Sequence, residues 1–130
     1  MSVDAIGDFL TIIRNGLMVS KKTVQAPYSV MRFTIAKLLK EHGYIKDVVV
    51  EGEGSDKTLK LFLKYVRGES VIHEIKRISK PSGRVYAGIK NVKPVIGNLG
   101  ITILSTNQGL VASTEAKKLN VGGEIICTVW

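Results

Sequence analysis

The sequence predicts an α+β protein of two small sub-domains, residues 1–68 with the element order α-β-α-β-β and residues 69–130 that are mainly β with one short helix. Three observations predict this class. Apolar residues recur every three or four positions from Val3 to Leu17, which is typical of an amphipathic helix. Side chains alternate with a period of two from Leu59 to Tyr65, which is typical of a half-buried strand. Beyond residue 69 the chain consists mostly of short β-rich runs between turns.

The first sub-domain is expected to hold five elements whose ends carry typical start and stop residues. In chain order they are a helix over residues 3–17, a strand over 23–26, a helix from Ser29 to His42, and strands over 44–50 and 59–65. Asp4 and Asp8 suit the positive end of the first helix, and Gly16 is expected to help end it. Ser29 is expected to cap the second helix. The glycines of residues 51–56 suit a tight turn between the last two strands.

The second sub-domain is expected to begin at Arg67–Ser70, where turn-forming residues break the strand pattern. Its expected elements are strands over residues 71–78, 84–87, 100–104 and 125–130, with a helix over 114–119 before the last strand. Ser113 is expected to cap that helix, and residues 105–109 form a polar loop. Residues 91–96 are ambiguous, because Pro94 would interrupt a helical turn there.

Composition and charge indicate a folded protein with a polyanionic partner. A chain of 130 residues fits one compact domain or two small ones packed closely together, and 45% hydrophobic residues can form a core. The net charge of +8 points first to nucleic acid and second to an anionic membrane surface, with simple solubility as the alternative. No acidic residue lies between Glu74 and Glu115. The basic residues of that span are Lys76, Arg77, Lys80, Arg84, Lys90 and Lys93.

The single cysteine and the hydropathy of the chain bear on its location. Cys127 has no partner for an intramolecular disulfide, which fits a reducing compartment, and its neighbours Ile125 and Ile126 predict a buried thiol. Neither a signal peptide nor an apolar stretch of about 20 residues is visible. We therefore expect a cytoplasmic or organelle-interior protein that is not associated with a membrane.

Enzyme motifs are not found. His42 and His73 lie far apart and have no neighbouring carboxylate or thiol pattern typical of a metal site. The segment Gly97–Gly100 is too short for a dinucleotide fingerprint or a phosphate loop. We therefore expect no catalysis, no metal and no cofactor.

The polar loop is the first candidate binding site. Ser105 to Gly109 presents hydroxyls, amides and backbone N–H groups directly after an apolar strand. Such groups suit the shallow minor groove of RNA, and turn amides can hold a phosphate. The alternative is a hairpin turn that satisfies its own hydrogen bonds.

Two further features are candidates. Gly122 and Gly123 allow close approach of another surface, and Glu124 could accept from a base or brace the polar loop from behind; a turn with a Glu–Lys pair is the alternative. Tyr86 could stack on a base or ribose while Arg84 takes a phosphate, but it could also be a core tyrosine with an exposed hydroxyl.

Several segments together resemble one family. They are Asp4–Asn15, Leu39–Ile45, Leu61–Tyr65, Arg77–Pro81, Leu99–Gly109, Glu115–Ala116 and Gly122–Ile126. Across essentially the whole chain, this pattern is similar to that of the small-subunit ribosomal protein eight family, of the bacterial or organellar type. The resemblance implies two tightly associated sub-domains and primary binding to a stem in the central domain of small-subunit rRNA. It also implies neighbouring ribosomal proteins as partners and, in some bacteria, repression of the protein's own operon mRNA.

The resemblance and the basic span together give the residues expected to contact RNA. They are Lys80, Arg84, Tyr86, Ser105, Thr106, Asn107, Gln108, Gly122, Gly123 and Glu124, with Arg14, Asn15, Ser29 and Arg32 in the first sub-domain. Asn107 and Gln108 depart from the family's usual serine and lysine, so Gln108 is expected to contribute hydrogen bonds with a smaller salt dependence. Val30 and Thr128 replace a usual lysine and tyrosine.

Overall fold

A computed structural model describes residues 4–88 and 100–130. The chain divides into two compact units. One is Ala5–Ile72, and the other is His73–Trp130 together with Asp4. The predicted boundary between the two sub-domains, at residues 68 and 69, stays a prediction. The α+β class is confirmed, with helices and sheet in the first unit and mainly strands with one short helix in the second.

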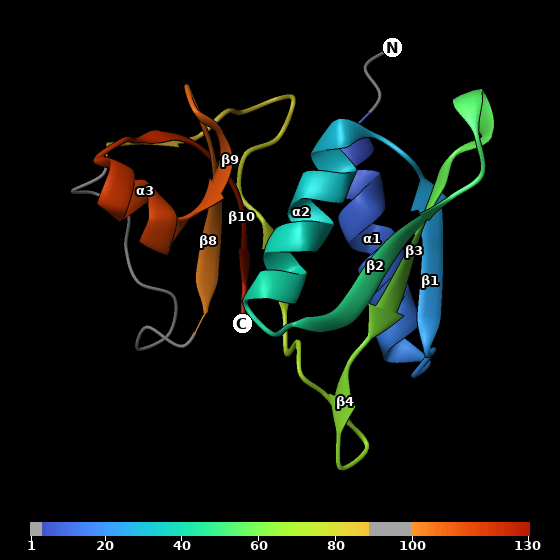
Figure 1. Cartoon of the computed structure of the whole chain (residues 1–130). Coiled ribbons are helices and arrows are strands. Elements are labelled where there is room, and N and C mark those ends of the chain that lie inside the picture. Colours follow the sequence, from blue (N-terminus) through green and yellow to red (C-terminus); the bar gives the residue numbers. More distant parts are fainter. Residues whose placement is uncertain (1–3, 89–99) are drawn as a thin grey trace. The chain divides into compact units, whose positions relative to one another are not determined.

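The Ala5–Ile72 unit holds two helices and a three-stranded antiparallel sheet of order β1-β3-β2 (Figure 1). Its elements are α1 (Ala5–Met18), β1 (Thr23–Pro27), α2 (Val30–Glu41), β2 (Ile45–Glu51), the 3₁₀ turn η1 (Gly54–Asp56), β3 (Thr58–Leu63), β4 (Tyr65–Val66) and β5 (Glu69–Ser70). The predicted order α-β-α-β-β is confirmed. Leu59, Leu61 and Leu63 are buried while the residues between them are partly exposed, so one sheet face forms the core with the helices.

Two predicted helix ends have different outcomes. Ser29 caps α2 as expected, because its Oγ accepts a hydrogen bond of 3.1 Å from the Arg32 N–H. Gly16 does not end α1, which continues to Met18. Gly16 is buried inside the helix, and a Cβ there would overlap the Val24 side chain. The glycine therefore permits close packing of α1 on β1.

The segment that was expected only to break the chain forms a small hairpin. β4 and β5 pair through Tyr65 with Ser70 and Val66 with Glu69. The two turn residues, Arg67 and Gly68, have φ values of 54° and 81°. Two residues at positive φ fit the right-handed twist of a two-residue hairpin.

The second unit is an antiparallel sheet of order β6-β10-β8-β9, with β7 also paired to β10. Its elements are β6 (Ile75–Arg77), β7 (Tyr86–Ala87), β8 (Ile101–Thr106), β9 (Gly109–Ala112), α3 (Ser113–Leu119) and β10 (Gly123–Val129). Leu104 and Ala116 are fully buried where α3 packs on the sheet. Cys127 is buried as expected, and this burial raises the pKa of its thiol to about 12.

Several predicted boundaries in this unit are wrong. The strand expected over residues 71–78 is limited to Ile75–Arg77, and the strand expected over 84–87 to Tyr86–Ala87. The final strand begins at Gly123 rather than at residue 125. The ambiguous residues 91–96, with Lys90 and Lys93, lie outside the described residues.

Ser113 does not cap α3. The N-cap is Ala112, whose side chain makes no capping hydrogen bond, and Ser113 is the first helical residue. The Ser113 Oγ instead accepts a hydrogen bond of 3.4 Å from the Thr102 N–H on β8. Within the described ranges, no helix has the length and apolar character to cross a membrane.

Candidate nucleic-acid interface

The expected polar loop is the tip of a β8–β9 hairpin. Ser105 and Thr106 belong to β8, where they face Leu110 and Gly109, so only Asn107 and Gln108 form the turn. Gly109 has a φ of 100°, a conformation that favours glycine. The sequence did not predict β9, which has only four residues. The loop prediction is therefore corrected to a tight hairpin with an exposed two-residue tip.

Thr106 uses its hydroxyl inside this hairpin. The Oγ1 donates to the Gly109 carbonyl at 2.8 Å and accepts from the Gln108 N–H at 3.1 Å. A threonine hydroxyl has one proton and two lone pairs. Toward a ligand it can therefore only accept. Thr106 thus agrees with the alternative interpretation, a hairpin turn that satisfies its own hydrogen bonds. The Asn107 and Gln108 side chains, by contrast, are exposed at the tip.

Strand register brings three predicted residues into one row. Glu124 on β10 faces Ser105 on β8 and Tyr86 on β7. Directly opposed residues of antiparallel strands place their side chains on the same sheet face. Ser105, Glu124 and Tyr86, which lie up to 38 residues apart in sequence, are thus neighbours across three strands.

The Glu124 carboxylate is hydrogen-bonded to two other side chains. Its Oε2 accepts from the Ser79 hydroxyl at 2.5 Å and from the Arg84 guanidinium at 2.9 Å. The hydrogen bond from Ser79, followed by that from Arg84, lowers the pKa of Glu124 below its ordinary value. The carboxylate is therefore ionised at neutral pH. The alternative interpretation of Glu124 was an ion pair with a lysine, and in the structure its ion-pair partner is Arg84.

Ser79 is a functional candidate that the sequence did not reveal. It is 1% exposed, its Oγ also accepts from the Val85 N–H at 3.1 Å, and its own N–H donates to the Ile125 carbonyl at 3.1 Å. The serine thereby joins the segment after β6 to the segment before β7 and to β10. Ser79 directly precedes the turn Lys80–Gly83, and no local sequence pattern marks it as buried; its burial follows from its pairing with β10.

Gly123 has a packing role in the sheet. A Cβ at this position would overlap the backbone carbonyl of Ser105. The absence of a side chain therefore allows β10 to approach β8 beside the hairpin. Gly122 directly precedes β10 and is half-buried. The expected approach of RNA to both glycines stays a prediction.

The exposed residues beside the row are basic or aromatic. Tyr86 is 69% exposed, which rules out the core-tyrosine alternative. Arg84 is also exposed, and Lys80 is exposed in a turn closed by two backbone hydrogen bonds with Gly83. Arg77 differs, because its guanidinium donates to Asp4 at 2.5 Å and to the Ser79 carbonyl. Arg77 is thus engaged in structural contacts.

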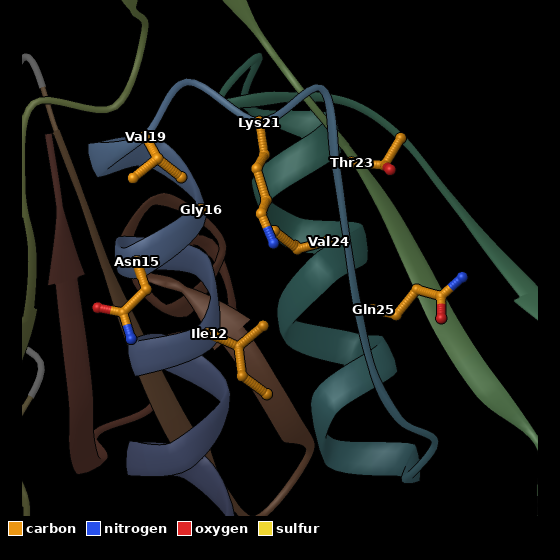
Figure 2. Close-up of a pocket in the computed structure, with 8 residues that line it drawn as sticks. All are labelled: Ile12, Asn15, Gly16, Val19, Lys21, Thr23, Val24 and Gln25. Carbon is orange, nitrogen blue, oxygen red and sulfur yellow. The ribbon is translucent and has the colours of Figure 1, made fainter.

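The four candidates of the other unit are not equivalent. Arg14 and Asn15 are exposed on α1, and Asn15 lines an open groove of about 700 Å³ between α1 and β1 (Figure 2). Ser29 uses its hydroxyl in the α2 cap. Arg32 is 8% exposed and donates to the carbonyls of Ala5 and Pro27 at 3.0–3.2 Å. This geometry favours a structural role for Arg32, and its contact with RNA stays a prediction.

The arrangement suits binding rather than chemistry. The row offers a clamped carboxylate, an exposed guanidinium, an aromatic ring and hairpin amides, which can recognise phosphate, ribose and bases. In the part of the chain that the structure describes, no three His, Cys, Asp or Glu residues gather as a metal site. The fold is that of a small basic α+β protein, and the exposed basic and aromatic residues of the site are of the kind that nucleic-acid-binding proteins use.

Comparison with known proteins gives the family. The family model described as ribosomal protein S8 matches residues 4–130. The small ribosomal subunit protein uS8 of Maricaulis maris (strain MCS10) is 50% identical, with 99% of each chain covered. The proteins of that name from Burkholderia lata and Chlamydia pneumoniae are 45% and 42% identical, covering 97% and 100% of this chain and 96% and 98% of their own lengths.

The chain belongs to the ribosomal protein S8 family. The resemblance noted in the sequence is thereby confirmed. Because this is a family of structural proteins, the expectation that the chain is not an enzyme is confirmed as well.

Proposed function

We propose that this chain is a structural constituent of the small ribosomal subunit that binds rRNA directly and early in assembly. Family membership and the names of its relatives support the ribosomal role. The proposed target is a stem in the central domain of small-subunit rRNA, whose binding orders that region for neighbouring ribosomal proteins. The protein would act on ribosomes in the cytoplasm, or inside an organelle if its source is organellar.

The observation that carries the binding mode is the row Ser105–Glu124–Tyr86 beside the hairpin tip. Exposed Lys80 and Arg84 attract and neutralise phosphates. Asn107 and Gln108 then donate to and accept from ribose hydroxyls and base edges, while Thr106 accepts only. The 69% exposed ring of Tyr86 stacks on a base or ribose.

Glu124 takes part in this mode chiefly through its partners. Its Oε2 already accepts from Ser79 and Arg84, so the carboxylate fixes Arg84 beside Tyr86 and braces the Ser105 strand. A guanidinium held in place before binding loses less conformational entropy when it meets a phosphate. Glu124 thus fixes the geometry of the surface that contacts RNA.

The proposal is tested by footprinting the purified protein on its own small-subunit rRNA. Protection confined to one central-domain stem supports it. Diffuse protection along the RNA would reduce the protein to a general basic binder. Competition between the rRNA stem and a fragment of the protein's operon mRNA tests the proposed repressor activity, which would use the same surface.

Variants of the hairpin connect the footprint to named residues. Thr106→Ala should weaken stem affinity by about 1–2 kcal/mol, the usual scale for one lost polar contact at a wet interface. Because the Thr106 hydroxyl also stabilises the turn, Asn107→Ala is the matched variant, since its exposed side chain lies at the tip. Unchanged affinity in filter binding for both variants, with the fold intact by circular dichroism, would remove the hairpin from the RNA interface.

A further inference from the structure

The three-stranded sheet of the Ala5–Ile72 unit has one end with an excess of positive charge. Thr23 faces Phe62 and Ile45 faces Leu63, so the start of β1, the start of β2 and the end of β3 lie together. The basic residues at this place, called the basic end below, are Lys21, Lys22, Lys46, Lys64 and Arg67.

The opposite end of the same sheet is acidic. Glu51, Glu53 and Asp56 lie in or beside the turn between β2 and β3, with Lys57 as the basic residue there. Charge is therefore segregated along the sheet rather than mixed. Solubility requires only net charge, whereas a concentrated positive field attracts a polyanion.

Among the described residues, the five basic side chains of the basic end form no ion pair. The nearby carboxylate of Asp47 forms an ion pair with Lys40, with 2.9 Å between Lys40 Nζ and Asp47 Oδ1. The hydrogen bond from Lys40 lowers the pKa of Asp47. Glu41 at the end of α2 and Glu69 on β5 are further carboxylates near this end, fewer than the five basic residues. The excess of positive charge is therefore available to a ligand.

Hydrogen bonds to backbone carbonyls hold the basic end together. The Tyr65 hydroxyl donates to the Lys21 carbonyl at 2.6 Å, and the Leu63 N–H donates to the Lys22 carbonyl at 2.9 Å. On the helix side, the Lys21 N–H donates to the Gly16 carbonyl at 2.9 Å. The lysines are thus carried on a backbone fixed to both α1 and β3.

Arg67 occupies a position that its residue type does not favour. Its φ of 54° lies in the left-handed region, where asparagine and glycine are less strained. An arginine at this exposed hairpin tip adds a positive charge to the basic end, which asparagine or glycine would not supply.

A groove between α1 and β1 adjoins the basic end. It is open, has a volume of about 700 Å³, and is lined by apolar residues such as Ile12 and Val24 as well as by Asn15 and Lys21. Figure 2 shows the Lys21 side chain extending between α1 and β1. The groove therefore places one more ammonium group at the basic end, where phosphates of an RNA backbone would be neutralised.

We propose that the basic end binds the sugar–phosphate backbone of an RNA segment other than the stem that the β8–β9 hairpin contacts. This inference rests on the proposed function, because it assumes that the partner of the whole chain is rRNA. The contact is independent of base sequence, since it uses point charges directed at phosphates.

The test compares two double variants that remove the same charge from this unit. Lys22→Gln/Lys64→Gln alters the basic end, and Lys37→Gln/Lys57→Gln alters exposed lysines elsewhere. Each full-length variant is titrated with the complete small-subunit rRNA over a range of salt concentrations. The basic-end variant should reduce the slope of log K against log salt by about 1.4–1.8, and the control should leave the slope unchanged.

Hydroxyl-radical footprinting on the same RNA distinguishes this inference from the proposed function. The basic-end variant should lose a protected segment outside the stem while stem protection persists. Equal slopes and footprints for both double variants, with the stem still protected, would overturn this inference alone. Absence of stem protection by the unaltered protein would instead contradict the proposed function. Loss of binding to phosphatidylglycerol vesicles without any change on RNA would assign the basic end to a membrane and overturn the inference.

Arg67→Asn gives a test in which stability and binding change in opposite directions. Asparagine tolerates the left-handed conformation, so the melting temperature should rise. Removal of the charge should at the same time lower the salt slope on the complete rRNA by about 0.7–0.9. A stabilised variant with an unchanged slope would show that Arg67 does not contact RNA.

Discussion

Ser79 shows at the scale of one residue how a buried hydroxyl can organise an exposed surface. Ser79→Ala removes the donor to Glu124 and the acceptor of the Val85 N–H, so we expect a loss of about 1–3 kcal/mol in the free energy of unfolding. Urea unfolding at pH 7 measures this loss. Ser82→Ala, in the neighbouring exposed turn, is the control and should be nearly neutral.

The same variant changes the pH dependence of stability. A depressed folded pKa contributes stability that is present above the ordinary value of 4.5 and is lost as pH falls through the folded pKa. Ser79→Ala removes the largest cause of that depression. The variant should therefore lose less stability than the unaltered protein between pH 5 and pH 3 (roughly the range in which such carboxylates titrate). Parallel pH profiles would mean that Ser79 does not hold the Glu124 carboxylate.

Arg32 illustrates the opposite case, a cation whose charge is used inside the fold. Arg32→Ala leaves the carbonyls of Ala5 and Pro27 without their buried donor, so we expect a loss of about 2–4 kcal/mol in stability. Affinity for the rRNA stem, measured on the folded fraction, should not change. A loss of affinity for the stem at normal stability would contradict this and show that Arg32 contacts RNA. Lys37→Ala on the exposed face of α2 is the control.

At the scale of the element, the approach of β10 to β8 depends on one missing side chain. Gly123→Ala introduces a Cβ that overlaps the Ser105 carbonyl, so β10 and β8 must separate beside the hairpin. We expect a loss of about 1–3 kcal/mol in stability and weaker stem binding. Gly83→Ala is the matched control, because a Cβ there meets no atom within 4 Å. Equal stability of the two variants, measured by thermal unfolding, would contradict the overlap.

The elements also show how far the sequence determines this fold. α1, α2 and β3 could be predicted because their burial follows periods of 3.6 and 2, which local sequence records. β9 could not, since its four residues lack alternation and it becomes a strand only by pairing with β8. The polar residues Ser105 to Gly109 could be singled out from their composition, and their contact with RNA stays a prediction. The burial of Ser79 and the pairing of Glu124 with Arg84 depend on the register of β10, which no local pattern encodes.

At the scale of the whole molecule, net charge of +8 sets general attraction to RNA, while the hairpin tip carries no charge. Gln108→Lys places a cation at that tip, so it separates the two effects. If the tip contacts the RNA backbone, this variant should steepen the slope of log K against log salt by about 0.9 on the duplex stem. Ser55→Lys adds the same charge in the η1 turn of the other unit and should leave the slope unchanged.

The two lysine variants also bear on the origin of selectivity. Because phosphate contacts carry no sequence information, Gln108→Lys should raise affinity for the specific stem and for an unrelated duplex by similar factors at low salt. The ratio of the two affinities should then stay constant or fall. A larger gain on the specific stem would mean that a cation at position 108 meets a base edge, where lysine can bond guanine, and the role of the tip as a hydrogen-bonding reader would need revision.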